Sequence, residues 1–239
     1  MHIYCVNLEK RIDRKESAGR EFTREGLNVE FFPATDGRIN TPSGLDVNPA
    51  EYGCSMSHTR IWRDIVDKGH EVSLIFEDDV RLVPNFNSKL KLILEEVKDL
   101  EWDIIHLGPL IPIIKRQITP NVYEGQPLGT HAYMMSLECA KKIAAFDPAL
   151  FKVSVDFQLN RFPLRILCVN TSLAKQESIE DEPLIGLMKS AVGGDIGLQR
   201  TFDLNYLIRW IIQRFRVILA LVIPFLVLYT VNILEVKVR

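Results

Sequence analysis

The sequence predicts an α/β fold, in which a mostly parallel central sheet carries helices on both faces. Short apolar runs of strand length alternate along the chain with longer segments whose apolar residues recur at helical spacing, and this alternation favours a parallel sheet. The chain has 239 residues, 47% of them hydrophobic, so it can bury a substantial core. This length suits one domain of this class plus an appendage, and two small domains are the alternative.

The expected strands are short and mostly apolar, and they comprise residues 2–7, 29–33, 71–76, 102–108, 131–136 and 165–170. The expected helices carry apolar residues at intervals of three and four, and they comprise residues 8–26, 55–69, 85–100, 137–146 and 155–162. Gly69 is expected to end the second of these helices. Residues 38–49 and the proline-rich segment 109–128 are expected to be irregular.

The charge balance and the cysteines indicate which partners and which cellular compartment to expect. The net charge of -2 shows no excess of basic residues, so nucleic acid is not expected as a partner. The four cysteines are far apart and form no C-x-x-C pair, and three lie in apolar stretches that suit a buried thiol. We expect a reducing compartment, although the spacing leaves disulfides open. The N-terminus "MHIYCVNLEK" is charged too soon for a signal peptide.

The segment "SLIFEDDVRL" runs an apolar strand directly into three carboxylates, Glu77, Asp78 and Asp79. In open α/β sheets the ligand site lies beyond the carboxyl ends of the strands, so these side chains are expected at the rim of the sheet. If the extended conformation continues, Glu77 and Asp79 face the same side. Two oxygen ligands at that spacing suit Mg²⁺ or Mn²⁺ bound together with substrate phosphates. A solvated turn that caps the next helix explains the spacing equally well.

Two further groups of polar residues are expected at the same rim. Asn7, Arg11 and Arg14 follow the first strand, and arginine forks match phosphate or nucleobase carbonyl groups. A solvated helix start is the alternative for these three. Asp36 and Gly37 follow the second strand, where a carboxylate can accept hydrogen bonds from a ribose.

Three more residues are candidates with a strong structural alternative. His58 lies in the helix before the acidic strand, and a single helical histidine is more often structural. His131 stands at the start of a later strand and is a weak candidate by itself. Asp156, in "VSVDFQLN", is an acid among apolar residues, and a helix N-cap is its alternative role.

Taken in order, several segments resemble the successive motifs of glycosyltransferase family 25, which includes bacterial lipo-oligosaccharide galactosyltransferases and the collagen galactosyltransferases. These segments are "IYCVNLEKRIDRKE", "FFPATDG", "YGCSMSHTRIW", "LIFEDDV", "WDIIHLG", "GTHAYMMS", "VSVDFQL" and "LAKQES". The resemblance covers roughly residues 2–178. The order and spacing of "GCSMSH", "FEDDV" and "HAYMMS" are the most specific part of this resemblance.

The resemblance implies a GT-A-type fold, a nucleotide-sugar donor and inversion at the anomeric carbon. It implies that Glu77 and Asp79 hold Mn²⁺ or Mg²⁺ at a D-x-D-like motif, although this chain has Glu where a strict motif has Asp. It implies a UDP-hexose donor, with galactose first and glucose next on family grounds. Asp156 is the expected catalytic base, with Asp103 as the second choice. The residues assigned to donor binding are Asn7, Arg11, Arg14, Asp36, Gly37, His58, Asp78 and His131.

The end of the chain leaves the resemblance, so we expect a catalytic domain over residues 1–190 and a membrane-associating tail over 191–239. "NYLIRWIIQRFR" places basic and apolar residues on opposite faces, which is typical of a helix at a membrane surface. Residues 217–234 then run for 18 residues without a charge, near the lower limit for a membrane span. We expect contact with a membrane through residues 203–234, on the cytoplasmic face where nucleotide sugars are used. A buried helix or an oligomer contact is the alternative.

The sequence is compatible with three functions. The first is a metal-dependent hexosyltransferase that extends a lipopolysaccharide, lipo-oligosaccharide or other glycan acceptor, including a lipid-linked one. The second is another metal-dependent nucleotidyl or phosphoryl enzyme of the same sheet class, which does not explain the ordered motifs. The third is a non-catalytic glycan-binding or scaffold protein that keeps the fold, against which the full set of acidic and basic rim residues argues.

Overall fold

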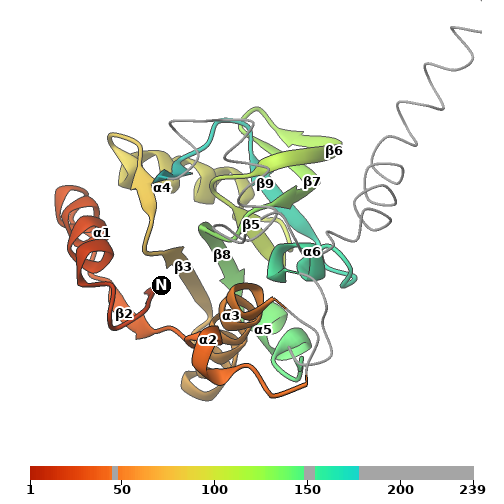
Figure 1. Ribbon diagram of the computed structural model, residues 1–239. Coiled ribbons are helices and arrows are strands. Elements are labelled where there is room, and N and C mark those ends of the chain that lie inside the picture. The colour runs from red at the N-terminus through yellow and green to blue at the C-terminus, as the bar shows by residue number, and fades with distance from the viewer. Residues whose placement is uncertain (45–47, 148–153, 178–239) are drawn as a thin grey trace, which may run out of the picture. The chain divides into compact units, whose positions relative to one another are not determined.

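An eight-stranded sheet forms the centre of the computed structural model, which describes residues 1–44, 48–147 and 154–177 (Figure 1). Its strands are β1 His2–Asn7, β2 Glu30–Pro33, β3 Val72–Glu77, β5 Ile104–His106, β6 Leu110–Thr119, β7 Val122–Leu128, β8 Ala132–Ser136 and β9 Ile166–Val169. They lie in the order β2-β1-β3-β8-β5-β9-β7-β6. A separate antiparallel pair joins β4 (Val80–Leu82) to β10 (Ala174–Gln176). The predicted α/β class is therefore confirmed.

The expectation of a mostly parallel sheet is wrong, because the sheet is mixed. β1 pairs in parallel with β2 and β3, and β5 pairs in parallel with β9. The pairs β3–β8, β5–β8, β6–β7 and β7–β9 are antiparallel. The physical reason is the short connections: β6 and β7 are joined by a tight turn, and no helix separates β7 from β8. Parallel neighbours need a longer crossover connection.

The segment 109–128, expected to be irregular, is the β6–β7 hairpin that causes this reversal. Pro112 argues against a strand in the sequence, since proline cannot donate a hydrogen bond to a neighbouring strand. β6 is the edge strand of the sheet, and its register with β7 shifts between Leu110 and Ile113, on either side of that proline. A proline is tolerated at such an edge irregularity, so the strand continues past it.

Helices cover both faces of the sheet, as the sequence predicts. The helices are α1 Ile12–Arg24, α2 Gly37–Asn40, α3 Pro49–Lys68, α4 Phe86–Val97, α5 Leu137–Ile143 and α6 Val155–Leu159. Residues of α1 and α4 share one buried cluster with Cys5 of β1, whereas residues of α3, α5 and α6 share the other with Tyr4. Adjacent residues of a strand point to opposite faces, so β1 contributes to both cores.

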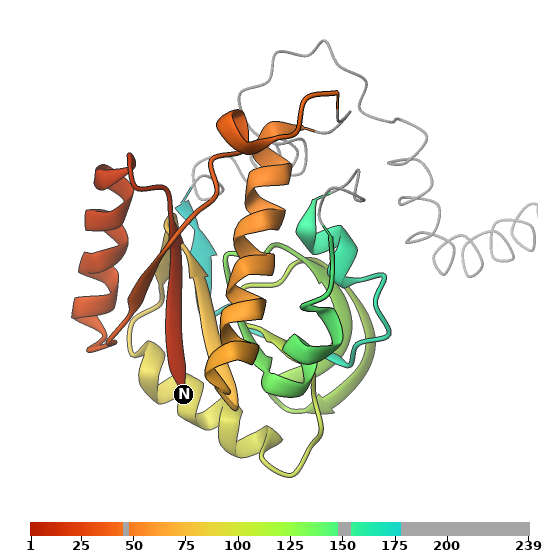
Figure 2. The same cartoon turned by 90° about the horizontal axis from the view of Figure 1, so that it is seen from below.

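Helix α3 is longer than expected and lies along the sheet beside β1 (orange in Figure 2). It begins at Pro49 instead of Ser55, because the Asn48 side chain accepts hydrogen bonds from the backbone N–H groups of Ala50 and Glu51 and so caps it. It ends at Gly69, whose φ of 64° is a left-handed helix cap, as predicted. The added turns bring Glu51 and Cys54 onto the helix.

The predictions for the tail lie outside the described residues, so they stay predictions. Within residues 1–44, 48–147 and 154–177, no helix has both the length and the apolar character to cross a bilayer. All four cysteines lie in the described part and are free thiols.

Candidate active site at the carboxyl end of strand β3

The acidic triplet lies where β3 ends and the chain turns into β4. Glu77 is the last residue of β3, Asp78 and Asp79 form the turn, and Val80 opens β4. Because the extended conformation stops at Glu77, the expected sharing of one face by Glu77 and Asp79 does not arise from strand alternation. Glu77 contacts α3 and the connection between β7 and β8, whereas Asp78 and Asp79 contact α1.

Glu77 is tied to two neighbours through one oxygen. Its Oε1 lies 3.3 Å from His58 Nε2 and accepts a hydrogen bond of 2.6 Å from Thr130 Oγ1. Burial alone would raise the pKa of Glu77, but the hydrogen bonds from His58 and Thr130 outweigh burial and hold it below its usual value. Glu77 is therefore a carboxylate fixed in orientation.

Asp78 and Asp79 share the guanidinium of Arg14. Arg14 Nη1 lies 3.0 Å from Asp78 Oδ1 and 3.4 Å from Asp79 Oδ2. Asn7 Nδ2 donates to Asp78 Oδ2 at 2.8 Å, and Gln176 Nε2 of β10 donates to Asp79 Oδ2 at 3.1 Å. The structure thus brings Asn7, Arg14 and the triplet together, as the sequence predicts.

Asp79 keeps one unused oxygen inside the protein. The residue is only 5% exposed, and its Oδ1 has no hydrogen-bond partner among the described residues. Burial and then the charge of Glu77 raise the pKa of Asp79 to about 7, although Arg14 acts in the opposite direction. A buried carboxylate oxygen without a donor is a group that a cation would stabilise.

His58 is the centre of a buried chain of hydrogen bonds. Its Nδ1 lies 2.9 Å from the hydroxyl of Tyr133, which also accepts a hydrogen bond of 3.0 Å from Trp62 Nε1. All three side chains are completely buried. The chain runs from Trp62 through Tyr133 and His58 to Glu77, so it fixes the ring plane of His58 against the acidic triplet.

Sequence reasoning missed two residues of α3: Cys54, which lies beside Glu77, and Glu51, whose charge interacts with that of Asp156. Cys54, His58 and Glu77 each offer one ligand atom, and these three atoms lie within 4.8 Å of one another. Burial, followed by the charges of Glu77 and Asp156, raises the pKa of the Cys54 thiol well above its usual range. Glu51 lies one turn earlier, and burial together with the charge of Asp156 raises its pKa to about 7. The missed signal is the spacing: residues 51, 54 and 58 fall on one helical face.

Asp156 lies at the start of α6 and is held by three donors. Its Oδ2 accepts from the backbone N–H of Gly129 at 3.0 Å, and its Oδ1 accepts from Ser154 Oγ and from the Phe157 N–H at 2.9 Å. The N-cap of α6 is Ser154, so the N-cap role considered for Asp156 is wrong; its side chain is instead anchored to the β7–β8 connection through Gly129. Its charge acts on both Glu51 and Cys54, which places it on the α3 side of the site.

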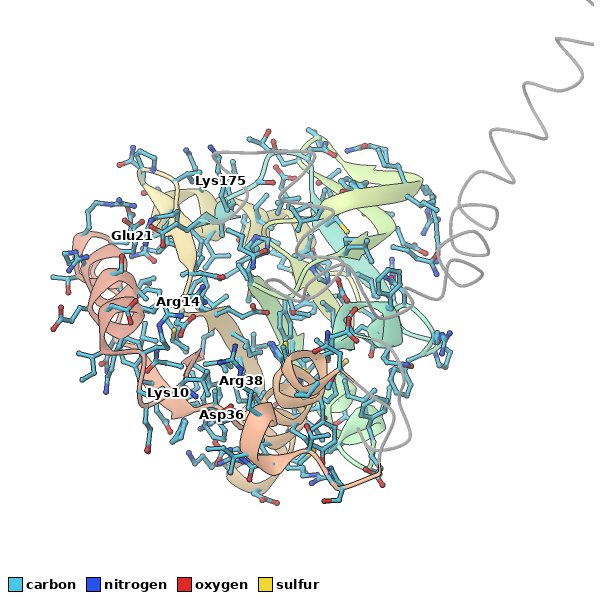
Figure 3. All side chains as sticks on the ribbon, in the orientation of Figure 1. Lys10, Arg14, Glu21, Asp36, Arg38 and Lys175 are labelled. Carbon is cyan, nitrogen blue, oxygen red and sulfur yellow. The ribbon has the colours of Figure 1, made fainter. Side chains whose placement is uncertain are left out.

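Three predicted donor-binding residues lie outside this cluster of contacts. Arg11 forms an ion pair with Asp13 at 2.7 Å instead of with the triplet. Asp36 caps α2 and is paired with Lys10 (Figure 3), and this pairing holds the pKa of Asp36 below its usual value. Gly37 has a packing role, because a Cβ atom there would lie 1.6 Å from the carbonyl oxygen of Pro49.

His131 and Asp103 are also accounted for by structural contacts. The carbonyl of His131 accepts from the Glu77 N–H at 3.0 Å, and its ring Nε2 lies 3.4 Å from the Ala174 carbonyl oxygen. Burial lowers the pKa of His131. Asp103, the second choice of base, precedes β5 and pairs with Lys142 at 2.6 Å. Because β3 and β5 are both antiparallel to β8, they run in the same direction, so Asp103 at the start of β5 lies at the opposite end of the strands from the triplet.

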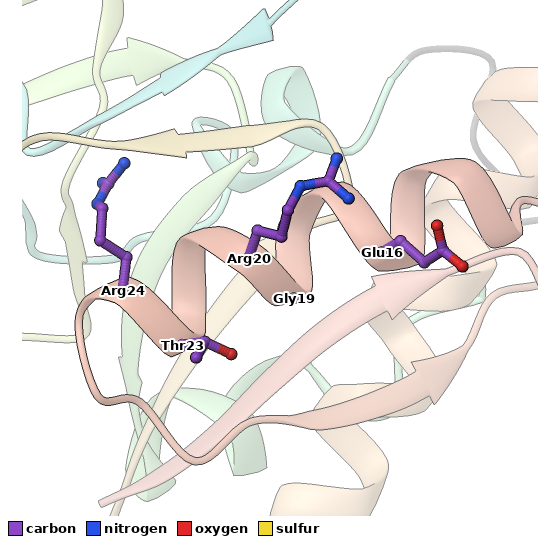
Figure 4. A pocket seen from close by; sticks show the side chains of 5 residues that line it. All are labelled: Glu16, Gly19, Arg20, Thr23 and Arg24. Atoms are coloured by element: carbon purple, nitrogen blue, oxygen red, sulfur yellow. The ribbon is translucent and has the colours of Figure 1, made fainter.

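A hollow along one side of α1 is separate from these contacts. Figure 4 shows the residues that line it, all of them from this single helix: Glu16, Gly19, Arg20, Thr23 and Arg24. None of them is a predicted site residue, so this hollow takes no part in the candidate site.

The chain is similar to several known proteins. Residues 1–111 match the model of "Glycosyltransferase family 25 (LPS biosynthesis protein)". A "Glycosyltransferase 25 family member" of Aedes aegypti is 31% identical over 179 residues, which cover 65% of this chain and 30% of that protein. "Procollagen galactosyltransferase 2" of Mus musculus is 28% identical, over 61% of this chain and 28% of that protein. "Probable inactive glycosyltransferase 25 family member 3" of Bos taurus is 31% identical, over 64% and 30%.

Solved structures resemble the chain more distantly. A glycosyltransferase involved in glycosylation of the major capsid of PBCV-1 has a TM-score of 0.43 and 14% identity, and the match covers 70% of this chain and 80% of that one. A putative glucose-1-phosphate thymidylyltransferase of Bacillus anthracis has a TM-score of 0.40 and 11% identity, over 84% and 79%.

The curated relatives are much longer proteins. The chain spans about 30% of the length of the relatives it matches first. The matched residues 1–111 contain the acidic triplet and the whole of α3. The resemblance read from the motifs is confirmed: the N-terminal part of the chain matches the family model, and the chain is similar to members of glycosyltransferase family 25.

Proposed function

We propose that this chain is a metal-dependent, inverting glycosyltransferase that moves a hexose, with galactose as the first choice, from a UDP-sugar to a glycan acceptor. The match to the family model supports glycosyl transfer in general, and relatives named procollagen galactosyltransferases support galactose. The observation that carries the proposal is the buried Asp79 carboxylate, with an unpaired oxygen, next to Glu77 and Arg14 at the carboxyl end of β3. A GT-A-type arrangement would place the donor at this edge.

The residues present fit a divalent ion. Asp79 Oδ1 lacks a partner among the described residues, and Glu77 supplies a second carboxylate whose charge acts on Asp79. Hard oxygen ligands of this kind suit Mn²⁺ or Mg²⁺, which leave room for phosphate oxygens. When bound, such an ion would supply Lewis-acid stabilisation of the departing diphosphate. Arg14, about one third exposed, can turn from Asp79 toward the same phosphates.

Two carboxylates compete for the role of base. Asp156 is oriented by Gly129, Ser154 and Phe157, which favours the role predicted from the sequence. Glu51 lies close enough to Asp156 for their charges to interact, and a pKa of about 7 is the value that suits proton transfer at neutral pH. We propose Asp156 as the base and Glu51 as the candidate that must be tested beside it.

The acceptor and the location remain proposals drawn from the sequence and the family description. The family model is described as an LPS biosynthesis protein, which supports a lipopolysaccharide or lipo-oligosaccharide acceptor. The apolar run 217–234 supports attachment to the cytoplasmic face of a membrane. Fractionation of cells that express the full-length chain tests this, and recovery of the protein entirely in the soluble fraction would contradict it.

The decisive experiment is nucleotide release from a panel of nucleotide sugars. We expect release of UDP that depends on Mn²⁺ or Mg²⁺, and we expect Asp79→Asn to abolish it. Asp99→Asn, which removes an exposed carboxylate just after α4, is the matched control and should keep wild-type turnover.

Two outcomes would point to other functions. Donor binding without turnover in the wild type would favour a non-catalytic protein, a possibility supported by the relative named as probably inactive. Release of pyrophosphate from a nucleoside triphosphate, instead of UDP from a sugar nucleotide, would favour a nucleotidyltransferase.

A further inference from the structure

We propose that Cys54, His58 and Glu77 form a binding site for a zinc-class divalent cation. This site differs in its ligands from the Glu77–Asp79 pair, because it adds a thiol and an imidazole to one shared carboxylate. It does not depend on sugar transfer, since it is defined by protein ligands alone. Imidazole and thiolate favour Zn²⁺ or Co²⁺, whereas Mn²⁺ and Mg²⁺ favour oxygen.

The distances fit three ligands of a tetrahedral ion. In a tetrahedral site, zinc bonds of about 2.0–2.3 Å imply ligand atoms roughly 3.3–3.8 Å apart. His58 Nε2 and Glu77 Oε1 already lie 3.3 Å apart, and Cys54 Sγ completes a group within 4.8 Å. Because Sγ lies within 4.8 Å of both other atoms, closing the gap needs a movement of at most about 1.5 Å, which a cysteine side-chain rotation can provide.

Two of the ligands are positioned by rigid structure. Cys54 and His58 are four residues apart on α3, so their side chains lie one above the other on the same face of the helix. Glu77 ends β3 and is held by Thr130. His58 is fully buried, whereas Cys54 and Glu77 are partly accessible. The site is therefore preformed on one side and open on the other, where water could complete the coordination.

Hydrogen bonds to the other ring nitrogen of His58 would orient this ligand. Ligating histidines usually donate their second ring N–H to a fixed acceptor. Here the only residue bonded to Nδ1 among the described residues is Tyr133, through its hydroxyl at 2.9 Å. Glu77 Oε1 lies 3.3 Å from Nε2 and, as a carboxylate, can only accept, so in the metal-free protein the proton of a neutral His58 sits on Nε2 and Nδ1 accepts from the Tyr133 hydroxyl.

Metal binding therefore has two proton consequences. The Nε2 position must become a lone pair, so the His58 proton moves to Nδ1 and is donated to Tyr133. The Cys54 thiol must lose its proton to the solvent as the sulfur–metal bond forms. The surrounding carboxylates Glu51, Asp79 and Asp156, whose charges all act on Cys54, leave a negative field that a cation neutralises.

The test uses the purified full-length chain under reducing conditions, with Co²⁺ as a spectroscopic probe and no sugar nucleotide. A thiolate bound to Co²⁺ gives a charge-transfer absorption band that carboxylate and imidazole ligands do not give. We expect this band in the wild type, its loss in Cys54→Ala, and its retention in Cys168→Ala. Cys168 is the matched control because it is buried in β9, remote in sequence and absent from the ligand group.

Competition with Zn²⁺ gives the second measurement. We expect Cys54→Ala to weaken Zn²⁺ binding at least about tenfold while it changes Mn²⁺ binding less than about threefold. Circular dichroism of Cys54→Ala and of Cys54→Ser identifies any loss of fold, and nitrogen NMR of His58 in the wild type reports the tautomer change without any substitution.

Absence of the charge-transfer band in the wild type, or equal Zn²⁺ binding by the wild type and Cys54→Ala, would overturn the proposal. Either result would leave the transferase proposal standing if Asp79→Asn still abolishes divalent-ion-dependent UDP release. Conversely, a thiolate band in a protein that never releases UDP would support this site and contradict the transferase.

Discussion

Replacing Tyr133 by Phe tests whether one hydroxyl organises the buried side of the site. The hydroxyl contacts Trp62 Nε1 at 3.0 Å and His58 Nδ1 at 2.9 Å, and all three side chains are completely buried. The substitution fills the same space but leaves the indole N–H and one ring nitrogen without a partner. A buried polar group that loses its partner costs about 1–3 kcal/mol, so the pair should lower the free energy of unfolding by about 3 kcal/mol.

Urea unfolding of the wild type and Tyr133→Phe measures this difference directly. At about 2–4 °C per kcal/mol for a domain of this size, the melting temperature should fall by roughly 6–12 °C. Tyr52→Phe is the matched control, because Tyr52 is also buried and has no hydrogen bond from its hydroxyl among the described residues. It should change stability by less than about 0.5 kcal/mol. If Tyr133→Phe behaved like Tyr52→Phe, the hydrogen-bond chain would be wrong.

Three other predictions concern packing, the base and pH. Gly37→Ala should lower the free energy of unfolding by at least about 3 kcal/mol, because its Cβ would overlap the Pro49 carbonyl. In the same urea unfolding assay Gly19→Ala should be neutral or stabilising, because a Cβ at this position of α1 meets nothing within 4 Å. Asp156→Asn should lower kcat with little change in donor affinity measured by calorimetry, whereas Glu51→Gln should do so only if Glu51 is the base. Burial and the charge of Glu77 raise the pKa of Asp79 from 3.8 to about 7, so the folded state holds an extra proton between these values. In the absence of metal, the contribution of Asp79 to the free energy of unfolding should therefore be lost as the pH rises through 7. Asp79→Asn should remove this pH dependence. An unchanged pH profile in Asp79→Asn would show that Asp79 is not the titrating group.

Local patterns predicted the elements that depend on local physics. Helix α1 and helix α4 follow from their apolar periodicity, and the end of α3 follows from Gly69. The start of α3 was placed six residues late, because "NPAEYGC" lacks an apolar face and only the cap by Asn48 reveals the helix. The mixed sheet could not be predicted, since strand direction depends on how the β6–β7 hairpin places β8 between β3 and β5.

In the candidate site, too, some positions could be predicted from the sequence and others could not. Asn7, Arg14 and the acidic triplet were predicted together because each follows the carboxyl end of a neighbouring strand, and parallel pairing of β1 and β3 brings those ends side by side. Arg11 and Asp36 also follow strand ends, but Arg11 pairs with Asp13 two residues along the chain. Asp36 pairs with Lys10, which the parallel pairing of β1 and β2 brings alongside. Spacing alone does not reveal which of several partners a charged side chain meets.

The glutamate at the start of the triplet explains why this chain departs from a strict D-x-D motif. Glu77 Oε1 reaches both His58 on α3 and Thr130 before β8. An aspartate is shorter by one carbon–carbon bond, roughly 1.5 Å, so the same backbone would carry its oxygens beyond hydrogen-bonding distance of His58. The negative charge would remain, but the connection between the end of β3 and α3 would be lost. Glu77 therefore serves two neighbours at once: its carboxylate charge acts on Asp79 in the turn, and its length brings an oxygen to the imidazole of His58.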